Sequence, residues 1–482
     1  MTDSPRLISR RTATGLLLTA STISPVLAQA PASNPVATAA PASAPALPSR
    51  TIVARPARFR LRPSSPRDAE CWAFDGLVPG PAIRIKLGEE LRLKVENRID
   101  KPIALHFHGM RGLATMDGVG GFSHDAIAPG ASFEYRFTPP DAGSFLFRPL
   151  LIGASSEAAD RGLSGMLVVE EAGERQVDHD IPVIIDDWLL ADDGAVQPFV
   201  ASAPEAAGAG RLGSWLTANG KAQPERISLP AGSRVRLRLA NACNARITRL
   251  RFDGMKAFVA AVDSQPTDTF EPVRAQLPFP PGSRYDIMFD MPEQVGEAAS
   301  VVALIGAGVP LVRLVSENRP AGPPRPARGE KVALAPNKLL PAAVRLQDAR
   351  RVELVLEGGA RITPEFKLDL TGVDLAKPWS LNGRQGDAKA PPLFSVRRGT
   401  PMVMALVNKT AFSQPLHVHG HSFRLLHPLD DGWEPYFLDT LQVPEGRTLR
   451  IAFIADNPGK WLISSTVLER FDVGFWTWFE VI

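Results

Sequence analysis

The clearest pattern along the chain is an alternation of apolar and polar positions that recurs in three places. In each place a glycine is followed nine residues later by an asparagine, and apolar side chains alternate between the two. The three stretches are 88–97, 232–241 and 399–408. Alternation with a period of two is typical of a β-strand with one buried face. The sequence therefore predicts one equivalent strand in each of three repeated units, half-buried in the first two copies and, because its intervening residues are also apolar, buried on both faces in the third.

A second repeated spacing lies downstream of each predicted strand. Gly130, Gly282 and Gly446 each follow a proline within two positions, and a phenylalanine stands seven residues after each glycine. Three matched copies of a strand-rich unit of about 120–150 residues indicate an all-β chain of three tandem sandwich domains. The predicted divisions are a first domain at 50–172, a second at 173–322, a proline-rich linker at 323–345 and a third domain at 346–482.

The N-terminus has the features of an export signal. Arg10 and Arg11 form a twin-arginine pair, and the apolar stretch 12–27 is too short and too rich in Ser and Thr for a membrane span. We predict a Tat-type signal peptide at 1–28 and a Pro/Ala-rich linker at 29–49. The expected location is the periplasm, with no transmembrane segment after signal removal. The alternative is a cytoplasmic protein with a frayed tail.

Charge and cysteine content narrow the function classes. Lys and Arg number 54 against 51 Asp and Glu, a net charge of +3, which gives no sign of nucleic-acid binding. Two cysteines exclude a disulfide-dense scaffold and a cysteine-rich metal cluster. We expect Cys71 and Cys243 to be buried, with an interdomain disulfide as the alternative. We also expect a monomer.

Histidines occur in pairs at equivalent places in the first and third units. His106 and His108, like His417 and His419, begin nine residues after the repeated asparagine. On a strand, residues i and i+2 point to the same side, so each pair can direct two imidazoles to one point. We predict that the two pairs meet between the first and third domains. Imidazole clusters suit copper, zinc, iron or nickel.

Two motifs together carry a family resemblance. The segments Leu-His-Phe-His-Gly (105–109) and Gln-Pro-Leu-His-Val-His-Gly-His (414–421) resemble those of the laccase-type multicopper oxidases. The resemblance covers about 50–482 and implies three tandem cupredoxin-like Greek-key β-sandwich domains. Enzymes of this family reduce oxygen to water at a trinuclear copper cluster that four His-x-His motifs hold. Their electrons arrive from a blue copper that two His and one Cys bind in the third domain.

The chain departs from this pattern at both kinds of copper site. The resemblance places Gln414 and Arg470 where the blue copper has its two histidines, and Ser465 where it has its cysteine. A blue site requires thiolate sulfur, and a protonated guanidinium cannot bind a metal. Two of the four His-x-His motifs are also replaced. Arg148 and Leu150 stand at the second motif, and the segment 464–466 stands at the fourth. We expect no blue copper, no intact trinuclear cluster and no laccase-type catalysis. The three blue-site replacements are predicted to form a repacked polar patch in which Gln414 supplies an acceptor to the Arg470 guanidinium, with a partner surface as a further possibility.

The surviving histidines leave two interpretations open. The resemblance implies that His106 and His417 match the two ligands of the type 2 copper, and that His108 and His419 match one ligand each of the binuclear pair. It also implies that Asp117 matches an acidic residue near the type 2 copper. These five residues either hold one copper or zinc ion or remain as hydrogen-bonded histidines at a domain interface. The other four histidines are expected to be structural or exposed: His124, His179, His421 and His427.

Two function hypotheses follow. The first is a non-catalytic periplasmic scaffold that binds an envelope protein partner. Ligand loss together with predicted Tat export resembles the FtsP (SufI) type, a copper-free branch of this fold that supports the division machinery under stress. The second is a mononuclear copper or zinc protein with residual oxidoreductase activity. The C-terminal aromatic residues are expected in the core of the last strand, with an exposed binding face as the alternative: Phe471, Phe475, Trp476, Trp478 and Phe479.

Overall fold

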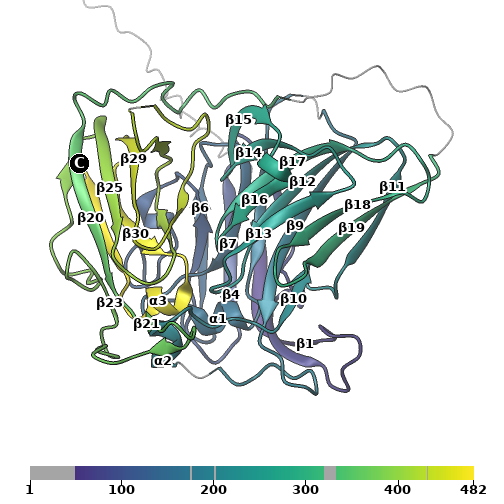
Figure 1. Ribbon diagram of the computed structural model, residues 1–482, viewed down its shortest axis with the longest axis horizontal. Coiled ribbons are helices and arrows are strands. Elements are labelled where there is room, and N and C mark those ends of the chain that lie inside the picture. Colours follow the sequence, from purple (N-terminus) through teal and green to yellow (C-terminus); the bar gives the residue numbers. More distant parts are fainter. Residues whose placement is uncertain (1–48, 174–175, 200–201, 320–332, 431) are drawn as a thin grey trace, which may run out of the picture. The chain divides into compact units, whose positions relative to one another are not determined.

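The structure, a computed structural model, is almost entirely β-strand (Figure 1). It describes residues 49–173, 176–199, 202–319, 333–430 and 432–482. The predicted signal peptide at 1–28, the N-terminal linker up to residue 48 and positions 323–332 of the second predicted linker lie outside the described residues. No helix within the described ranges is long and apolar enough to cross a membrane.

The first group of strands forms two four-stranded sheets with a shared core. Its elements are β1 (Arg50–Phe59), β2 (Ala69–Phe74), β3 (Ile83–Lys86), β4 (Leu91–Asn97), β5 (Leu105–His108), the 3₁₀ turn η1 (Ala114–Met116), β6 (Ser132–Phe137), β7 (Gly143–Pro149), α1 (Ser156–Asp160) and β8 (Gly165–Glu170). The sheet orders are β2-β1-β4-β6 and β3-β8-β7-β5. One buried cluster joins both sheets, with Leu93 and Tyr135 from the first and Phe107 and Phe147 from the second.

The second group forms a six-stranded and a five-stranded sheet. Its elements are β9 (His179–Trp188), α2 (Ala203–Ala207), β10 (Trp215–Ala218), β11 (Glu225–Pro230), β12 (Arg234–Asn241), β13 (Thr248–Asp253), β14 (Phe258–Val262), β15 (Gln265–Phe270), η2 (Val273–Ala275), β16 (Gln276–Phe279), β17 (Arg284–Asp290), β18 (Ala298–Ala303) and β19 (Val309–Glu317). The sheet orders are β10-β9-β12-β17-β14-β15 and β11-β19-β18-β13-β16.

The third group forms two five-stranded sheets and a short hairpin. Its elements are β20 (Arg350–Gly358), β21 (Arg361–Ile362), β22 (Leu368–Asp369), β23 (Trp379–Leu381), β24 (Ser395–Val396), β25 (Thr400–Asn408), β26 (Gln414–Val418), β27 (Arg424–Leu426), β28 (Thr440–Val443), β29 (Thr448–Ala455), β30 (Gly459–Ser465), α3 (Leu468–Asp472) and β31 (Trp476–Val481). The sheet orders are β23-β20-β25-β29-β27 and β24-β31-β30-β26-β28, and Figure 1 shows β20, β25 and β29 side by side.

The strands therefore fall into three sandwiches, at 50–170, 179–317 and 350–481, and the all-β, cupredoxin-like fold class is confirmed. No strand ladder among the described residues joins two of these groups. The residue boundaries of the three domains stay predictions.

The repeated alternation behaves differently in the three copies. In the third copy, β25 is half-buried at four of its nine positions, so its predicted burial on both faces is wrong. β4 alternates between buried and half-buried positions, as predicted. β12 is buried at every position, so its predicted half-exposed face is wrong. The reason is that its arginines are paired: Arg236 donates to Asp286 and Arg238 donates to Asp180, at 2.6 Å for the Arg238 Nε. A guanidinium that finds a carboxylate can be buried, and alternation of residue types does not reveal such a partner.

The repeated asparagines explain why the spacing recurs. In the first sandwich Asn97 Nδ2 donates to the carbonyls of Lys101 and Ile127, both at 2.8 Å, and Asn97 Oδ1 accepts from the N–H of Ile99. Asn241 and Asn408 make the same set of bonds: two carbonyls accept from Nδ2, and the N–H two residues on donates to Oδ1. The side chain thus ties the loop after the strand to a loop that arrives from farther along the chain.

We predict that Asn97→Ala lowers the free energy of unfolding by about 2–4 kcal/mol, because it removes three side-chain hydrogen bonds, two of them buried, and leaves the N–H of Ile99 without its acceptor. Urea unfolding followed by tryptophan fluorescence measures the change. The control is Asp369→Ala, which removes one side-chain bond to the N–H of Thr371 at the surface and should cost less than about 1 kcal/mol. Equal losses for the two variants would contradict the role given to Asn97.

Candidate functional site

The four paired histidines meet in one buried cluster. His106 and His108 lie on β5, His417 lies on β26 and His419 follows that strand directly. The ring centres of His106 and His419 are 4.5 Å apart, and the rings of His108 and His417 stack at 3.8 Å. All four are at most 3 % exposed. The predicted meeting of the two pairs is therefore found in the structure.

Backbone carbonyls fix the protonation of two of these imidazoles. His106 Nδ1 donates to the carbonyl of Asp117 at 2.6 Å, and His417 Nδ1 donates to the carbonyl of Asp439 at 2.9 Å. Because a carbonyl only accepts, Nδ1 carries the hydrogen and Nε2 keeps its lone pair. The Nε2 atoms of both histidines are buried and have no hydrogen-bond partner within the described residues. Two unsatisfied nitrogen lone pairs thus face the interior of the cluster.

Asp117 lies between the two pairs. Its Oδ2 accepts from His419 Nδ1 at 2.8 Å, and its Oδ1 lies 3.4 Å from His106 Nδ1. Burial alone would raise the pKa of Asp117, but the facing imidazoles outweigh burial and hold this pKa well below its usual range. Burial lowers the pKa of His419 to about 3, so this ring is neutral at physiological pH. The ionised Asp117 carboxylate therefore accepts from the neutral ring of His419.

The remaining ring nitrogens are occupied. His108 Nε2 shares a hydrogen bond of 2.8 Å with Thr440 Oγ1, and His419 Nε2 shares one of 2.9 Å with Ser464 Oγ. Ser464 stands where the resemblance places a histidine of the fourth motif, so a hydroxyl now uses the nitrogen that would otherwise bind a metal.

All five predicted site residues are brought together. The candidate ligand atoms lie within 4.8 Å of one another in two groups, His106 with His108 and His417, and His106 with Asp117 and His419. That a metal binds here stays a prediction.

A second layer of charge, absent from the sequence predictions, orients His417. Asp439 Oδ1 lies 3.3 Å from His417 Nδ1, and the Asp439 carboxylate forms a close ion pair with Arg284. Arg284 is fully buried, and its Nη1 also lies 3.7 Å from Asp263. Burial would raise the pKa of Asp439, but Arg284 outweighs burial and holds it well below its usual range. None of these residues belongs to a local motif, because each reaches its partner from a distant part of the chain.

Arg148 stands where the resemblance places a copper ligand of the family. It lies on β7 directly opposite His106 and is 2 % exposed. Its Nη2 donates to the carbonyl of Thr466 at 3.1 Å and its Nη1 to the carbonyl of Cys243 at 3.4 Å. Burial lowers the pKa of Arg148 to about 10, so the group remains a cation at neutral pH. A fixed positive charge beside the cluster opposes a second metal ion at this position.

The position where the resemblance places the blue copper is filled by a second buried arginine, Arg470. Arg470 Nη1 donates to Gln414 Oε1 at 2.6 Å, and Arg470 Nη2 donates to the carbonyl of Gly208 at 3.0 Å. The guanidinium carbon lies 4.9 Å from the ring centre of Trp379. Gln414, Ser465 and Arg470 are each at most 1 % exposed. The predicted polar patch, with Gln414 as an acceptor for Arg470, is found in the structure, but its use as a partner surface is wrong, because these side chains are buried and the cation meets its acceptors and an aromatic ring inside the protein.

The other sequence predictions are settled by burial and contacts. Cys71 and Cys243 are both buried and free, and they belong to separate apolar cores, so the structure contains no disulfide between them. His421 is buried against Trp461, while His427 is partly exposed and lies 3.3 Å from Asp430. The C-terminal aromatics belong to the core, as predicted, with exposures of 0–6 %: Phe471, Phe475, Trp476, Trp478 and Phe479.

Family models match both ends of the described chain. A multicopper oxidase model matches residues 59–174, and a second multicopper oxidase model matches residues 361–482. The two matched segments contain both histidine pairs. Both segments are similar to the multicopper oxidase family. Proteins of this family bind copper, and the candidate ligands described above lie inside the matched segments.

Relatives with full-length matches include both oxidases and a division protein. The chain is 26% identical over 417 residues to multicopper oxidase MmcO of Mycobacterium tuberculosis, which covers 81% of this chain and 79% of that protein. It is 28% identical to the cell division protein FtsP of Sodalis glossinidius, with 85% and 84% covered. A multicopper oxidase structure from Pseudomonas thermotolerans superposes with a TM-score of 0.77 at 28% identity, covering 90% of this chain and 99% of that chain.

We predict that Arg470→Met lowers the free energy of unfolding by about 2–4 kcal/mol, because Gln414 and the carbonyl of Gly208 lose their donor inside the core. Urea unfolding measures the loss. The matched control is Arg350→Met, since Arg350 also donates to a carbonyl, that of Ser395, and also lies over an aromatic ring, that of Phe394, but is exposed. This control should change stability by less than about 1 kcal/mol. An Arg470 variant as stable as the control would show that the guanidinium does not hold this position together.

Proposed function

We propose that this chain is a periplasmic multicopper-oxidase-fold protein without blue copper and without an intact trinuclear cluster, and that it acts as a non-catalytic scaffold or interaction protein of the cell envelope. The observation that carries the proposal is the Arg470 guanidinium, which lies in the former blue-copper position bonded to Gln414. A buried cation with its acceptors in place leaves neither the charge balance nor the ligands that a blue copper requires.

The absence of a thiolate supports the same conclusion. Ser465 stands where the family has its cysteine, and its Oγ is engaged with the backbone of Val467. Burial raises the pKa of Cys71 to about 12, and Cys243 lies in the core of the second sandwich. Neither thiol can replace the missing ligand, so the chain has no blue copper that could accept single electrons from a donor. Oxygen reduction with phenol donors is therefore not expected.

The location and partner rest on the predicted export signal and on relatives named cell division protein FtsP. A twin-arginine signal at 1–28 would deliver a folded protein to the periplasm. We propose an envelope protein as the partner and a monomeric state for the chain itself. The regular strands and turns of all three sandwiches are consistent with selection on shape after the copper chemistry was lost.

A second candidate function is favoured by one specific observation, the two unsatisfied Nε2 atoms. His106 Nε2 and His417 Nε2 are buried lone pairs without a partner, and this is the arrangement that a copper or zinc ion would satisfy. Asp117, which faces His106 and His419, would supply a nearby negative charge. Such an ion would provide Lewis-acid or one-electron chemistry to a substrate that binds it directly. This candidate is a mononuclear metal protein with residual oxidoreductase activity.

Metal content separates the two candidates. We expect protein exported from cells supplied with copper and zinc to contain only trace metal, to show no thiolate-to-copper absorption band and to consume no oxygen with phenol donors. Elemental analysis, optical spectroscopy and an oxygen electrode provide the three measurements. The variant His106→Ala/His417→Ala should then have the same metal content as the parent protein.

The matched control for that variant is His427→Ala, which removes a partly exposed histidine. About one metal ion per chain, kept in the control and lost in the double variant, would refute a metal-free scaffold and establish the second candidate. In that case copper or zinc should also raise the midpoint of thermal unfolding in the parent protein only, because a ligand bound to the native state stabilises it by mass action.

A further inference from the structure

The five-stranded sheet of the second sandwich has one face toward the core and one face toward solvent. Figure 1 shows three of its strands, β11, β19 and β18, side by side. Along β11 and β19 the side chains alternate: Ile227, Leu229 and Leu314 pack in the core, whereas Arg226 and Arg313 are exposed. The histidine cluster lies on other strands, β5 and β26, so this face is a separate feature of the molecule.

The exposed face carries two like charges at adjacent positions. Arg226 and Arg313 are register partners on the parallel strands β11 and β19. Neighbouring strands are about 4.8 Å apart, so the two arginine side chains rise from the sheet next to each other. Neither side chain makes an ion pair or a side-chain hydrogen bond within the described residues. Like charges placed in this way repel each other, and a carboxylate that contacts both relieves the repulsion.

The acidic residues of the same face do not neutralise this pair. Asp253 lies in the same row of the sheet, two strands away, and accepts from Arg251 at 2.7 and 2.8 Å. Glu317 lies at the far end of β19, where Pro230 is its register partner. Arg249 on β13 adds a third exposed guanidinium that forms no ion pair within the described part of the chain. The face therefore has an excess of positive charge.

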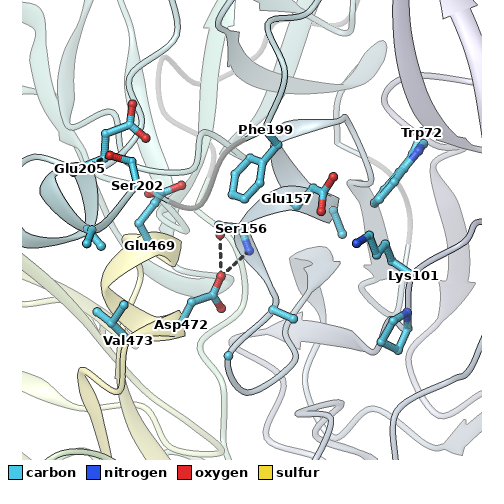
Figure 2. Close-up of a pocket in the computed structure, with 16 residues that line it drawn as sticks. Trp72, Lys101, Ser156, Glu157, Phe199, Ser202, Glu205, Glu469, Asp472 and Val473 are labelled. Atoms are coloured by element: carbon cyan, nitrogen blue, oxygen red, sulfur yellow. Dashed lines mark hydrogen bonds between the residues drawn. The ribbon is translucent and has the colours of Figure 1, made fainter. Parts of the chain in front are cut away.

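The pocket between the short helices α1, α2 and α3 differs in this respect (Figure 2). There the Asp472 carboxylate accepts from the N–H groups of Ser155 and Ser156 at 2.7 and 2.9 Å. Glu157, on the other side of the pocket, is paired with Arg161 at 3.0 Å. These charged groups have partners inside the protein, whereas the arginines on the exposed sheet face do not.

Small side chains surround the arginine pair. Ser300 follows Arg313 in the same row, and Ser228, Val315 and Ala298 form the next row. Side chains of this size allow the backbone of another chain to approach the sheet. None of the large apolar side chains exposed within the described residues lies on the five strands of this sheet. The face therefore lacks the apolar groups that insert into a lipid surface.

We propose that this face of the second sandwich docks an extended acidic segment of an envelope protein, with carboxylates at alternate positions that pair with Arg226 and Arg313. The inference rests on the proposed scaffold function, for which it names the docking surface. Alternate side chains of an extended chain are about 7 Å apart on one side, a spacing that two neighbouring guanidinium groups can reach. Arginine binds carboxylates through two parallel hydrogen bonds, so such pairs also fix the direction of the segment.

The test is a fluorescence anisotropy titration of labelled hexaglutamate with the purified protein, with hexaglutamine as the ligand control. We expect saturable binding of hexaglutamate only. An increase in salt from about 30 to about 300 mM should weaken it about 10-fold, because exposed ion pairs are screened. The variant Arg226→Gln/Arg313→Gln should weaken binding about 10-fold or more, and each single variant should weaken it by a smaller factor.

The matched control is Arg361→Gln/Arg397→Gln, which removes two exposed arginines of the third sandwich and changes the net charge by the same amount. This control should change the affinity by less than about 2-fold. The substituted side chains are exposed in both double variants, so both should unfold at the same temperature as the parent protein.

Three outcomes would overturn the proposal: no saturable binding of hexaglutamate, equal weakening by the two double variants, or tighter binding of phosphatidylglycerol vesicles than of hexaglutamate through the same two arginines. The last outcome would assign the face to a membrane. None of these measurements depends on metal content. Elemental analysis tests the metal-free scaffold separately, so failure of the docking surface and failure of the proposed function are distinguishable.

Discussion

The constraint on which the rest of this structure depends is the burial of three arginine side chains between sandwiches. Each is at most 2 % exposed, and a guanidinium cannot be removed from water unless its N–H groups find acceptors. Each finds at least one acceptor in another sandwich. The acceptors are Cys243 and Thr466 for Arg148, Ser144 and Asp439 for Arg284, and Gly208 for Arg470. The sandwiches must therefore associate in one register, because any other register leaves a buried cation unpaired.

This register also determines the geometry of the histidine cluster. Arg284 holds the Asp439 carboxylate, and Asp439 holds His417 through its carbonyl. On the other side, Asp117 reaches from the first sandwich to His419 in the third. The imidazoles therefore keep fixed tautomers and directions even without a metal to organise them. A cluster supported in this way keeps its geometry whether or not an ion binds.

The sequence predicted what depends on local pattern. The repeated asparagine spacing located three equivalent strands, since the hydrogen bonds of Asn97 recur around Asn241 and Asn408. The His-x-His pairs were also readable, because strand geometry puts alternate residues on one side. The partners of the buried charged side chains could not be predicted from such patterns. The burial of Arg470 depends on Gly208, which is 262 residues away, and a charged residue is ordinarily expected at the surface. Pairing across such distances leaves no periodic signal in the sequence.

The same physics explains how the fold can outlast its copper chemistry. A copper ion in a protein is a buried cation held by ligands from more than one element, and removing it leaves empty volume and unpaired polar groups. An arginine side chain both fills the empty volume and satisfies the unpaired polar groups. Its guanidinium supplies positive charge and five donors, and its flat surface packs on rings such as Trp379. It cannot change oxidation state. Under the proposed function, Arg470 in place of a metal and Arg148 in place of a ligand keep the contacts between sandwiches without electron transfer, so stability and redox chemistry are separable properties of one architecture.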